Sequence, residues 1–276
     1  AILDEVDRQM STYRTDSDLA VFNRLSAGSC QTMPQPVLEL VRYAGELSEL
    51  SDGQFDITIQ PLLDVWSFGP GSRGHQVPTA AAIAEARAQM GFAHLNIQGD
   101  QLCKAIDLKL DLNSIAAGDT VDRIAARFEA MGIDSYMIEV TGELIAKGKK
   151  PDGSPWRIAL EQPLGKGERV LQWVLEIDGW GVNTSGDYRN YFEEDGVRFS
   201  HTLNPKTGAP IAHHTAAVTV IDRSARVADG LGTLLLVLGL EEGMALAQAH
   251  DIAALFVTRE QGEFRSHASP AFEQLF

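Results

Sequence analysis

The chain has few basic residues: 23 Lys and Arg stand against 38 Asp and Glu among 276 residues, a formal net charge of −15 at pH 7. Nucleic acids and anionic membrane surfaces attract basic patches, so this deficit argues against a general binding surface for either. A phosphate-bearing ligand would need local help against the negative charge, from a metal ion or from backbone N–H groups.

Long apolar runs, repeats and cysteine clusters are also missing. No apolar run approaches membrane-span length, and the first residues show no signal-peptide pattern. No internal repeat or low-complexity linker divides the chain. Its two cysteines, Cys30 and Cys103, can pair or stay free, and their spacing indicates no metal site. With 44% apolar residues, the chain can form one large domain or two closely packed lobes.

Apolar periodicity and Gly/Pro punctuation predict an α+β fold, mostly antiparallel sheet with helices packed on its faces. The predicted helices are 2–10, 17–23, 36–50, 80–90, 115–128, 225–238 and 241–250. The predicted strands are 55–58, 94–97, 106–112, 136–140, 156–160, 170–177, 182–185, 188–192 and 197–203, with two more closing the chain.

The run 182–211, VNTSGDYRNYFEEDGVRFSHTLNPKTGAPI, is the densest in residues that carry chemistry. Its Asp195-Gly196 pair predicts a hairpin, and 204–210 predicts a second turn with Pro presetting φ and Gly supplying a positive φ. His201 therefore lies at the end of a strand, beside a polar turn. Its unperturbed pKa of about 6.5 suits a general base, although an isolated strand histidine is more often structural. We expect a ligand here.

Asp229 and Thr233 lie four residues apart on the predicted helix 225–238, so they share one face. A carboxylate and a hydroxyl are hard oxygen ligands that suit Mg²⁺. The alternative is an acidic residue in the first turn that favours the helix dipole. Gly230 and Gly232 lie between them and indicate close approach by backbone or ligand.

The segment 110–115, LDLNSI, is predicted to end a strand and begin a helix. Asn113 or Ser114 can cap that helix and leave N–H groups free for a phosphate or a carbonyl oxygen. Asp111 alternates with two leucines, so we expect it on the solvated side of its strand. Two acidic residues of the next helix are expected on its solvent face: Asp119 and Asp122.

Aromatic side chains offer flat surfaces for a planar heterocycle at Tyr13 and at 66–68. Core packing is the ordinary explanation for Trp66 and Phe68. The segment 141–143, Thr-Gly-Glu, follows a predicted strand and turns sharply, which fits a ligand edge or a simple tight turn.

Seven segments along nearly the whole chain resemble the ApbE family of flavin transferases. The segments are STYRTDSDLAVFN, FDITIQPLLDVWSFGP, LDLNSIAAGDTVD, YMIEVTGELIAKG with SPWRIAL, TSGDYRNYF, SHTLNPKTGAPI and ADGLGTLLLVLG. Each is weak alone, but seven in order at family-like spacing are specific. The resemblance implies an ApbE-like FAD-binding fold over 1–276. It also implies an enzyme that splits FAD with Mg²⁺, releases AMP and attaches FMN through a phosphoester to a Thr or Ser of a partner protein.

The resemblance further implies roles for individual residues. The implied metal ligands are Asp229, Thr233 and the backbone carbonyl of Ser114. The implied FAD contacts are Tyr13, Gln54, Phe55, Asp56, Asp111, Ala117 and the backbone at Leu203. His201 would take the proton from the acceptor hydroxyl. The implied partner is a redox subunit of a membrane electron-transfer complex, on the periplasmic or other extracytoplasmic side of a bacterial inner membrane, with a lipid anchor left open.

The chain departs from the family pattern at several places. Ala117 stands where family members carry a long polar residue before the glycine, Thr141 replaces one glycine of a Gly-Gly turn, and Asn204 replaces the usual Asp. Two alternatives stay open beside the transferase. One is an Mg²⁺-dependent FAD pyrophosphatase that yields FMN and AMP, and the other is a non-catalytic flavin-binding assembly factor.

Overall fold

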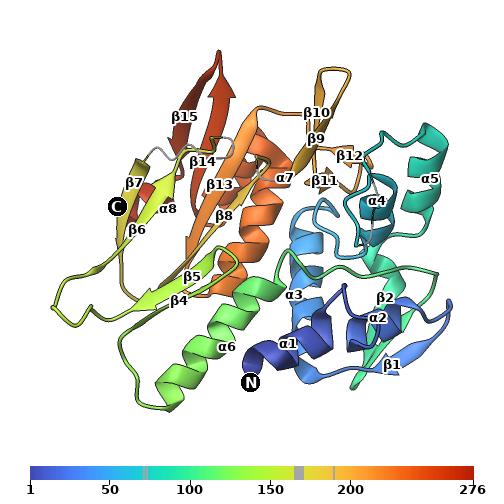
Figure 1. Ribbon diagram of the computed structural model, residues 1–276, viewed down its shortest axis with the longest axis horizontal. Helices are drawn as coiled ribbons and strands as arrows, with labels where there is room; N and C mark the ends of the chain where they lie inside the picture. The colour runs from blue at the N-terminus through green and yellow to red at the C-terminus, as the bar shows by residue number, and fades with distance from the viewer. Residues whose placement is uncertain (71, 73, 165–170, 189) are drawn as a thin grey trace. The chain divides into compact units, whose positions relative to one another are not determined.

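The structure is a computed structural model that describes residues 1–70, 72, 74–164, 171–188 and 190–276. The chain forms two compact units (Figure 1). The first comprises 1–116 and 191–211, and the second comprises 117–190 and 212–276. Every strand pair among the described residues is antiparallel, which confirms the predicted α+β class.

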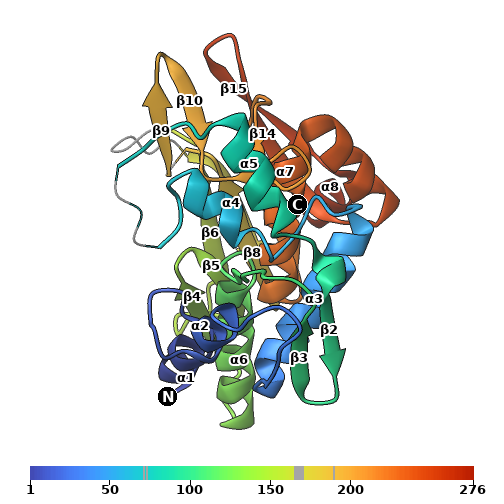
Figure 2. The ribbon, with the colours of Figure 1, turned by 90° about the vertical axis from the view of Figure 1, so that its right-hand side faces the viewer.

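The first unit combines helices with a small sheet and two hairpins. Its helices are α1 (Ile2–Met10), α2 (Asp18–Asn23), α3 (Gln35–Leu50), α4 (Gln60–Val65), α5 (Ala80–Ala88) and the 3₁₀ turn η1 (Phe92–His94). Its sheet has the order β1 (Cys30–Thr32), β3 (Gln101–Lys104), β2 (Leu95–Gln98), and Figure 2 shows β2 and β3 as neighbouring strands. The hairpins are β9 (Tyr191–Glu194) with β10 (Val197–Ser200), and β11 (Leu203–Asn204) with β12 (Ala209–Pro210).

The helix starts in this unit follow local capping chemistry. The Ser17 hydroxyl accepts the N–H of Ala20 at the start of α2, and the Thr79 hydroxyl accepts the N–H of Ala82 at the start of α5. Pro36 lies in the first turn of α3, where backbone N–H groups have no partner within the helix, so the N–H that proline lacks costs no hydrogen bond. The helices predicted at these positions are therefore confirmed.

The hairpin around Asp195-Gly196 is also confirmed. Both residues have positive φ, 51° and 75°, and Glu194 pairs directly with Val197. These values fit the two-residue turn whose twist matches the flanking strands. β10 ends at Ser200, short of the predicted strand 197–203, so His201 lies just after the strand and beside the turn. Two residues of predicted strands, Val170 and Arg189, lie outside the described residues.

The core of the first unit lies between α4, α5 and the two hairpins. It contains Leu62, Trp66, Ala86, Met90, Phe192 and Leu203, with Phe68 and Phe199 packed against it. The core explanation for Trp66 and Phe68 is therefore correct. Cys30 and Cys103, which the sequence left open, stand opposite each other in the β1–β3 register and form a disulfide.

Two predicted strands of this unit are wrong. Residues 55–58 form a turn, because Oδ1 of Asp56 accepts hydrogen bonds from both the N–H and the hydroxyl of Thr58. Residues 106 and 107 form a bend, and 108–112 have no regular secondary structure and belong to no sheet. Their backbone groups bond to side chains instead, for example to the amide of Asn23 and the ammonium of Lys104.

The second unit is built on a six-stranded sheet. The strand order is β15 (Glu263–Ala268), β14 (Ala253–Glu260), β13 (Thr215–Asp222), β8 (Trp180–Gly186), β5 (Glu143–Lys147), β4 (Tyr136–Val140). A separate ribbon pairs β6 (Trp156–Glu161) with β7 (Leu171–Ile177). The helices are α6 (Ala116–Ala130), α7 (Ala225–Ala249) and α8 (Pro270–Leu275).

Apolar side chains cover both faces of this sheet. Val121 and Ala125 of α6 pack with Ile138, Ile145 and Ala225, and α7 runs along β13 and β8 (Figure 1). A second cluster joins the β6–β7 ribbon and α8 to residues of the sheet: Ala146, Leu160, Leu175, Ile177, Val182, Ile221, Ala253, Leu255 and Phe272. The sheet is thus sandwiched, with α7 beside its central strands.

α7 is interrupted at Gly239, whose φ of 76° and ψ of −175° are not helical. The segments on either side correspond to the two helices predicted at 225–238 and 241–250. In the described part of the chain α7 alone has the length and apolar composition of a membrane span. Its apolar residues are largely buried, as in the core helix of a globular unit.

Asp119 and Asp122 were expected on the solvent face of α6, and this prediction is wrong. Asp119 is buried, with a carboxylate oxygen 3.6 Å from Nη1 of Arg226. Asp122 accepts hydrogen bonds from the hydroxyl of Ser224 and from the N–H groups of Ala225 and Arg226. It thereby satisfies free N–H groups in the first turn of α7, where negative charge is favourable.

Candidate functional site

The predicted metal-binding pair lies in the N-terminal part of α7. Asp229 is only 3% exposed. Its Oδ2 accepts the N–H of Gly118 at 3.0 Å, and its Oδ1 accepts Nδ2 of Asn183 at 3.3 Å. These two donors fix the carboxylate while leaving lone pairs on both oxygens for a further partner.

Glycines make this geometry possible. A Cβ at position 118 would collide with the carbonyl group of Ala225, so Gly118 lets α6 approach the start of α7. A Cβ at position 232 would collide with Oδ1 of Asn183. The glycines beside Asp229 were expected to allow close approach by another group, and at Gly232 the side chain of Asn183 makes that approach.

Three further side chains surround the pair and were not predicted from the sequence as a group: Asn183, Glu143 and Ser185. Nδ2 of Asn183 also donates to Oε1 of Glu143 at 3.2 Å. The hydroxyl of Ser185 donates to Oδ1 of Asn183 at 3.1 Å and lies 3.5 Å from the hydroxyl of Thr233. The sequence held one signal for this group: Asn183 and Ser185 are two residues apart on the predicted strand 182–185, so they share a face.

The two carboxyl groups at this site, of Asp229 and Glu143, have no cationic partner among the described residues. Burial raises the pKa of Asp229 well above its usual value, and the nearby Glu143 raises it further. Burial is also the main cause of the raised pKa of Glu143. Among the described residues no basic side chain forms an ion pair with either group. Carboxylate and hydroxyl oxygens without a cationic partner fit a divalent hard cation such as Mg²⁺.

In the first unit Asp111 is 6% exposed, so the expectation of a solvated side chain is wrong. Its carboxylate accepts the N–H of Asn113 at 2.7 Å and Nδ2 of the same residue at 2.9 Å. Burial is the main reason why its pKa rises to about 6. The N–H of Asp111 donates to the carbonyl of Ile57, which places it beside the predicted flavin-binding segment 54–56.

The same segment lies beside the turn 204–210. Nδ2 of Asn204 donates to Oε1 of Gln54 at 3.1 Å, and the ammonium of Lys206 pairs with the carboxylate of Asp52. These contacts bring the predicted contacts Gln54 and Leu203 into neighbouring segments. Phe55 and Leu203 are each 3% exposed as whole residues, so their side chains belong to the interior of the unit.

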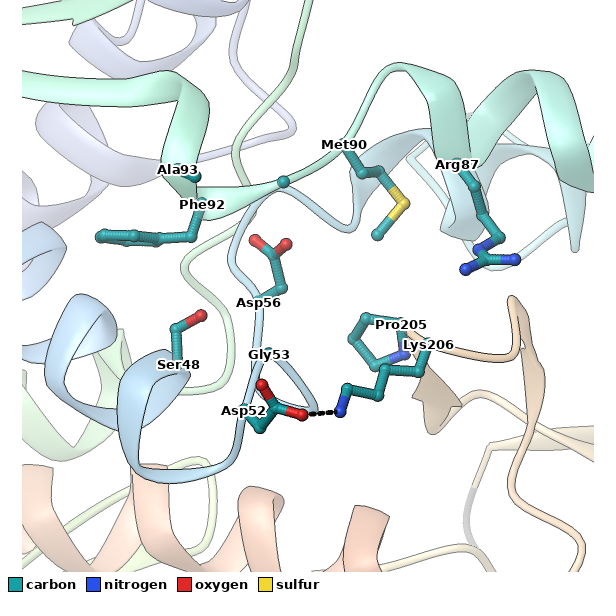
Figure 3. A pocket seen from close by; sticks show the side chains of 11 residues that line it. Ser48, Asp52, Gly53, Asp56, Arg87, Met90, Phe92, Ala93, Pro205 and Lys206 are labelled. Atoms are coloured by element: carbon teal, nitrogen blue, oxygen red, sulfur yellow. Dashed lines mark hydrogen bonds and ion pairs between the residues drawn. The ribbon is translucent and has the colours of Figure 1, made fainter.

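A cavity of about 440 Å³ opens between these segments (Figure 3). Its lining residues are Ser48, Asp52, Gly53, Asp56, Arg87, Met90, Gly91, Phe92, Ala93, Pro205 and Lys206. Figure 3 shows the Asp56 carboxylate between Phe92 and Met90, and burial is the main cause of its raised pKa. The cavity thus combines apolar wall with the guanidinium of Arg87, the carboxyl group of Asp56 and the Lys206–Asp52 ion pair, a mixture suited to a ring that carries polar groups.

The remaining predicted residues lie in varied settings. The imidazole of His201 meets the ring of Phe68 edge-on, with centroids 6.3 Å apart. Tyr13 is 82% exposed in the loop between α1 and α2, where it offers an open aromatic face. Ser114 lies in the turn immediately before α6, and Ala117 lies in the first turn of that helix.

Known proteins resemble this chain over nearly its full length. The model of the ApbE family matches residues 1–256. A Vibrio cholerae protein named FAD:protein FMN transferase is 43% identical over 273 residues, covering 99% of this chain and 81% of the relative. An Escherichia coli protein of the same name is 37% identical over 276 residues, covering 98% of this chain and 78% of the relative.

Solved structures show the same likeness. The apo form of the flavinyl transferase ApbE from Pseudomonas stutzeri superimposes with a TM-score of 0.92 at 56% identity, covering 100% of this chain and 85% of that one. An ApbE protein from Thermotoga maritima gives a TM-score of 0.87 at 27% identity, covering 99% and 89%. The chain is a member of the ApbE family.

Proposed function

We propose that this chain is a FAD:protein FMN transferase. It cleaves the pyrophosphate of FAD, releases AMP and joins FMN to a Thr or Ser hydroxyl of a partner protein. A bond forms between the acceptor oxygen and the FMN phosphorus, the bond from that phosphorus to the AMP oxygen breaks, and a base takes the hydroxyl proton. The relatives of this family bear this name, and the observation that carries the proposal is the pair formed by the buried Asp229 and the half-buried Thr233, one turn apart on α7.

Asp229 and Thr233 would hold a Mg²⁺ ion. The bound ion would neutralise negative charge that develops on the pyrophosphate as AMP leaves. Gly118 and Asn183 orient the Asp229 carboxylate, so its position is fixed before the ion arrives. The contribution of Ser114 through its carbonyl stays a prediction from the family resemblance.

The first unit would supply the flavin-binding segments. Gln54, Asp111 and Leu203 lie in segments joined by hydrogen bonds, which supports a common binding surface. His201 is the residue proposed to take the acceptor proton, because a hydroxyl is a poor nucleophile until a base removes its proton. Phe68 packs edge-on against its ring, which restricts the orientation of the imidazole.

The extracytoplasmic side of a bacterial membrane is the proposed location. Disulfides form and persist in oxidising compartments and are rare in the cytosol, and Cys30 and Cys103 are paired. Rapid acid quenching of cells followed by thiol alkylation tests this location. We expect both cysteines to be protected until a reductant is added, whereas free thiols in the native protein would contradict it.

The acceptor is proposed to be a redox subunit of a membrane electron-transfer complex on the same side. An acceptor that a Vibrio cholerae relative flavinylates in a parallel reaction provides the test. Incubation with this chain, FAD and Mg²⁺ should give a fluorescent acceptor band in a denaturing gel and one AMP per FMN transferred. Free FMN accumulating without acceptor would favour a pyrophosphatase instead, and bound FAD without AMP release would favour a non-catalytic binding protein.

A further inference from the structure

One amide group connects the two carboxyl groups of the candidate metal site. Nδ2 of Asn183 donates to Oδ1 of Asp229 at 3.3 Å and to Oε1 of Glu143 at 3.2 Å. An amide nitrogen carries two hydrogens, so it can serve both acceptors. The carbonyl oxygen of the same amide accepts the hydroxyl of Ser185, which leads on to Thr233. Asn183 is therefore the one residue in direct contact with three others of this group.

The fold fixes the amide in this place. Asn183 lies in β8, between the neighbouring strands β5 and β13, and is 3% exposed. Leu144 pairs with Val182 across the β5–β8 register, which brings Glu143 next to Asn183. On the other side α7 approaches so closely that a Cβ at position 232 would collide with Oδ1. Strand, neighbouring strand and helix thus all constrain one side chain.

We propose that Asn183 is the positioning residue of this site. Its amide holds Asp229 in the orientation that presents an oxygen to a divalent cation, and it retains Glu143 as a second carboxyl group close by. The proposal rests on the assignment of Asp229 and Thr233 as metal ligands made above.

The physical reason is the balance between two like charges. Two neighbouring carboxylates repel each other, and without a donor between them one of them turns away. The N–H groups of the amide stabilise both ionised forms without adding a positive charge that would compete with a cation. Groups that orient ligands in this way commonly change metal affinity by about 10- to 100-fold when removed.

Mn²⁺ provides a direct probe, because free Mn²⁺ gives an EPR signal that disappears on binding. With FAD present, we expect Asn183→Ala to raise the Kd for Mn²⁺ by about 10- to 100-fold. The matched control is Thr184→Ala: Thr184 is the next residue of β8, on the opposite face, where its hydroxyl bonds to Thr219. This control should leave the Kd within about twofold, with thermal unfolding midpoints of both variants recorded.

A double-mutant cycle separates positioning from simple folding damage. Gly232→Ala should displace the amide and weaken Mn²⁺ binding, yet it should add no further loss when Asn183 is already alanine. An Asn183→Ala protein that binds Mn²⁺ as tightly as wild type, or a Thr184→Ala protein equally weakened, would overturn the proposal. If wild type binds no more tightly than Asp229→Ala, the metal site itself is wrong, and the role of Asn183 falls with it.

Discussion

Asn23 pairs with both backbone groups of Leu110, although 87 residues separate them. Its Nδ2 donates to the Leu110 carbonyl at 2.9 Å, and its Oδ1 accepts the Leu110 N–H at 2.8 Å. The side-chain amide thus takes the place of a neighbouring strand for the segment that leads to Asp111 and Ser114. The conformation of this site-forming segment depends on one side chain of α2.

Asn23→Ala should destabilise the protein by about 2–3 kcal/mol, because it leaves a donor and an acceptor of the backbone without partners. Urea unfolding measures the loss. Hydrogen exchange of peptides covering 106–112 should accelerate in the variant. Asn96→Ala, at an exposed position of β2, should change neither quantity, and equal effects of the two substitutions would contradict this role of Asn23.

Asp111 should make stability fall as the pH rises from about 4 to 6. Burial raises its folded pKa to about 6, above an unfolded value near 4, so in this window the folded state keeps a proton that the unfolded state releases. Asp111→Asn abolishes this titration, and the stability of the variant relative to wild type should increase across the window by roughly 3 kcal/mol at most.

Urea unfolding without FAD at several pH values from 4 to 7 gives this difference. Asp100→Asn, at an exposed position, serves as the control for the loss of one acidic side chain. A constant difference between wild type and Asp111→Asn over the whole range would show that Asp111 does not titrate there.

Breaking the Cys30–Cys103 disulfide should lower stability, because the bridge spans 73 residues and restricts the unfolded chain. The chain-entropy estimate for a loop of that length is about 4 kcal/mol, an upper figure for this bridge. The thermal unfolding midpoint should fall when a reductant is present. In a Cys30→Ala/Cys103→Ala variant the reductant should have no effect, and a wild-type midpoint insensitive to reductant would contradict the bridge.

His201→Ala should leave FAD affinity nearly intact and abolish transfer to the acceptor. The substitution removes the proposed base, whereas the segments around Gln54 and Asp111 stay in place. Equilibrium binding of FAD and the rate of acceptor labelling measure the two quantities separately. A parallel loss of both would assign His201 to binding instead.

Elements that local chemistry determines could be predicted from the sequence. The hairpin at Asp195-Gly196 follows from two residues that tolerate positive φ, and α5 starts at a threonine that caps it. The shared face of Asp229 and Thr233 follows from helix periodicity alone.

Features that depend on partners far along the chain could not be predicted from the sequence. Asp122 reads as a solvent-facing residue of an amphipathic helix, yet its partners Ser224, Ala225 and Arg226 lie about 100 residues further along the chain. β13 was not predicted, because a strand buried on both faces shows no alternation of apolar and polar residues. Asn183 became visible only when the sheet placed β5 beside β8.

The most direct test of the account is the intact mass of the acceptor protein after reaction with FAD and Mg²⁺. Wild type should add the mass of FMN less one water to a single Thr or Ser, and Asp229→Ala should add nothing while keeping its fold. An acceptor of unchanged mass, under conditions in which the Vibrio cholerae relative modifies it, would contradict the proposed transfer. Equal modification by Asp229→Ala would contradict the role of the buried carboxylate.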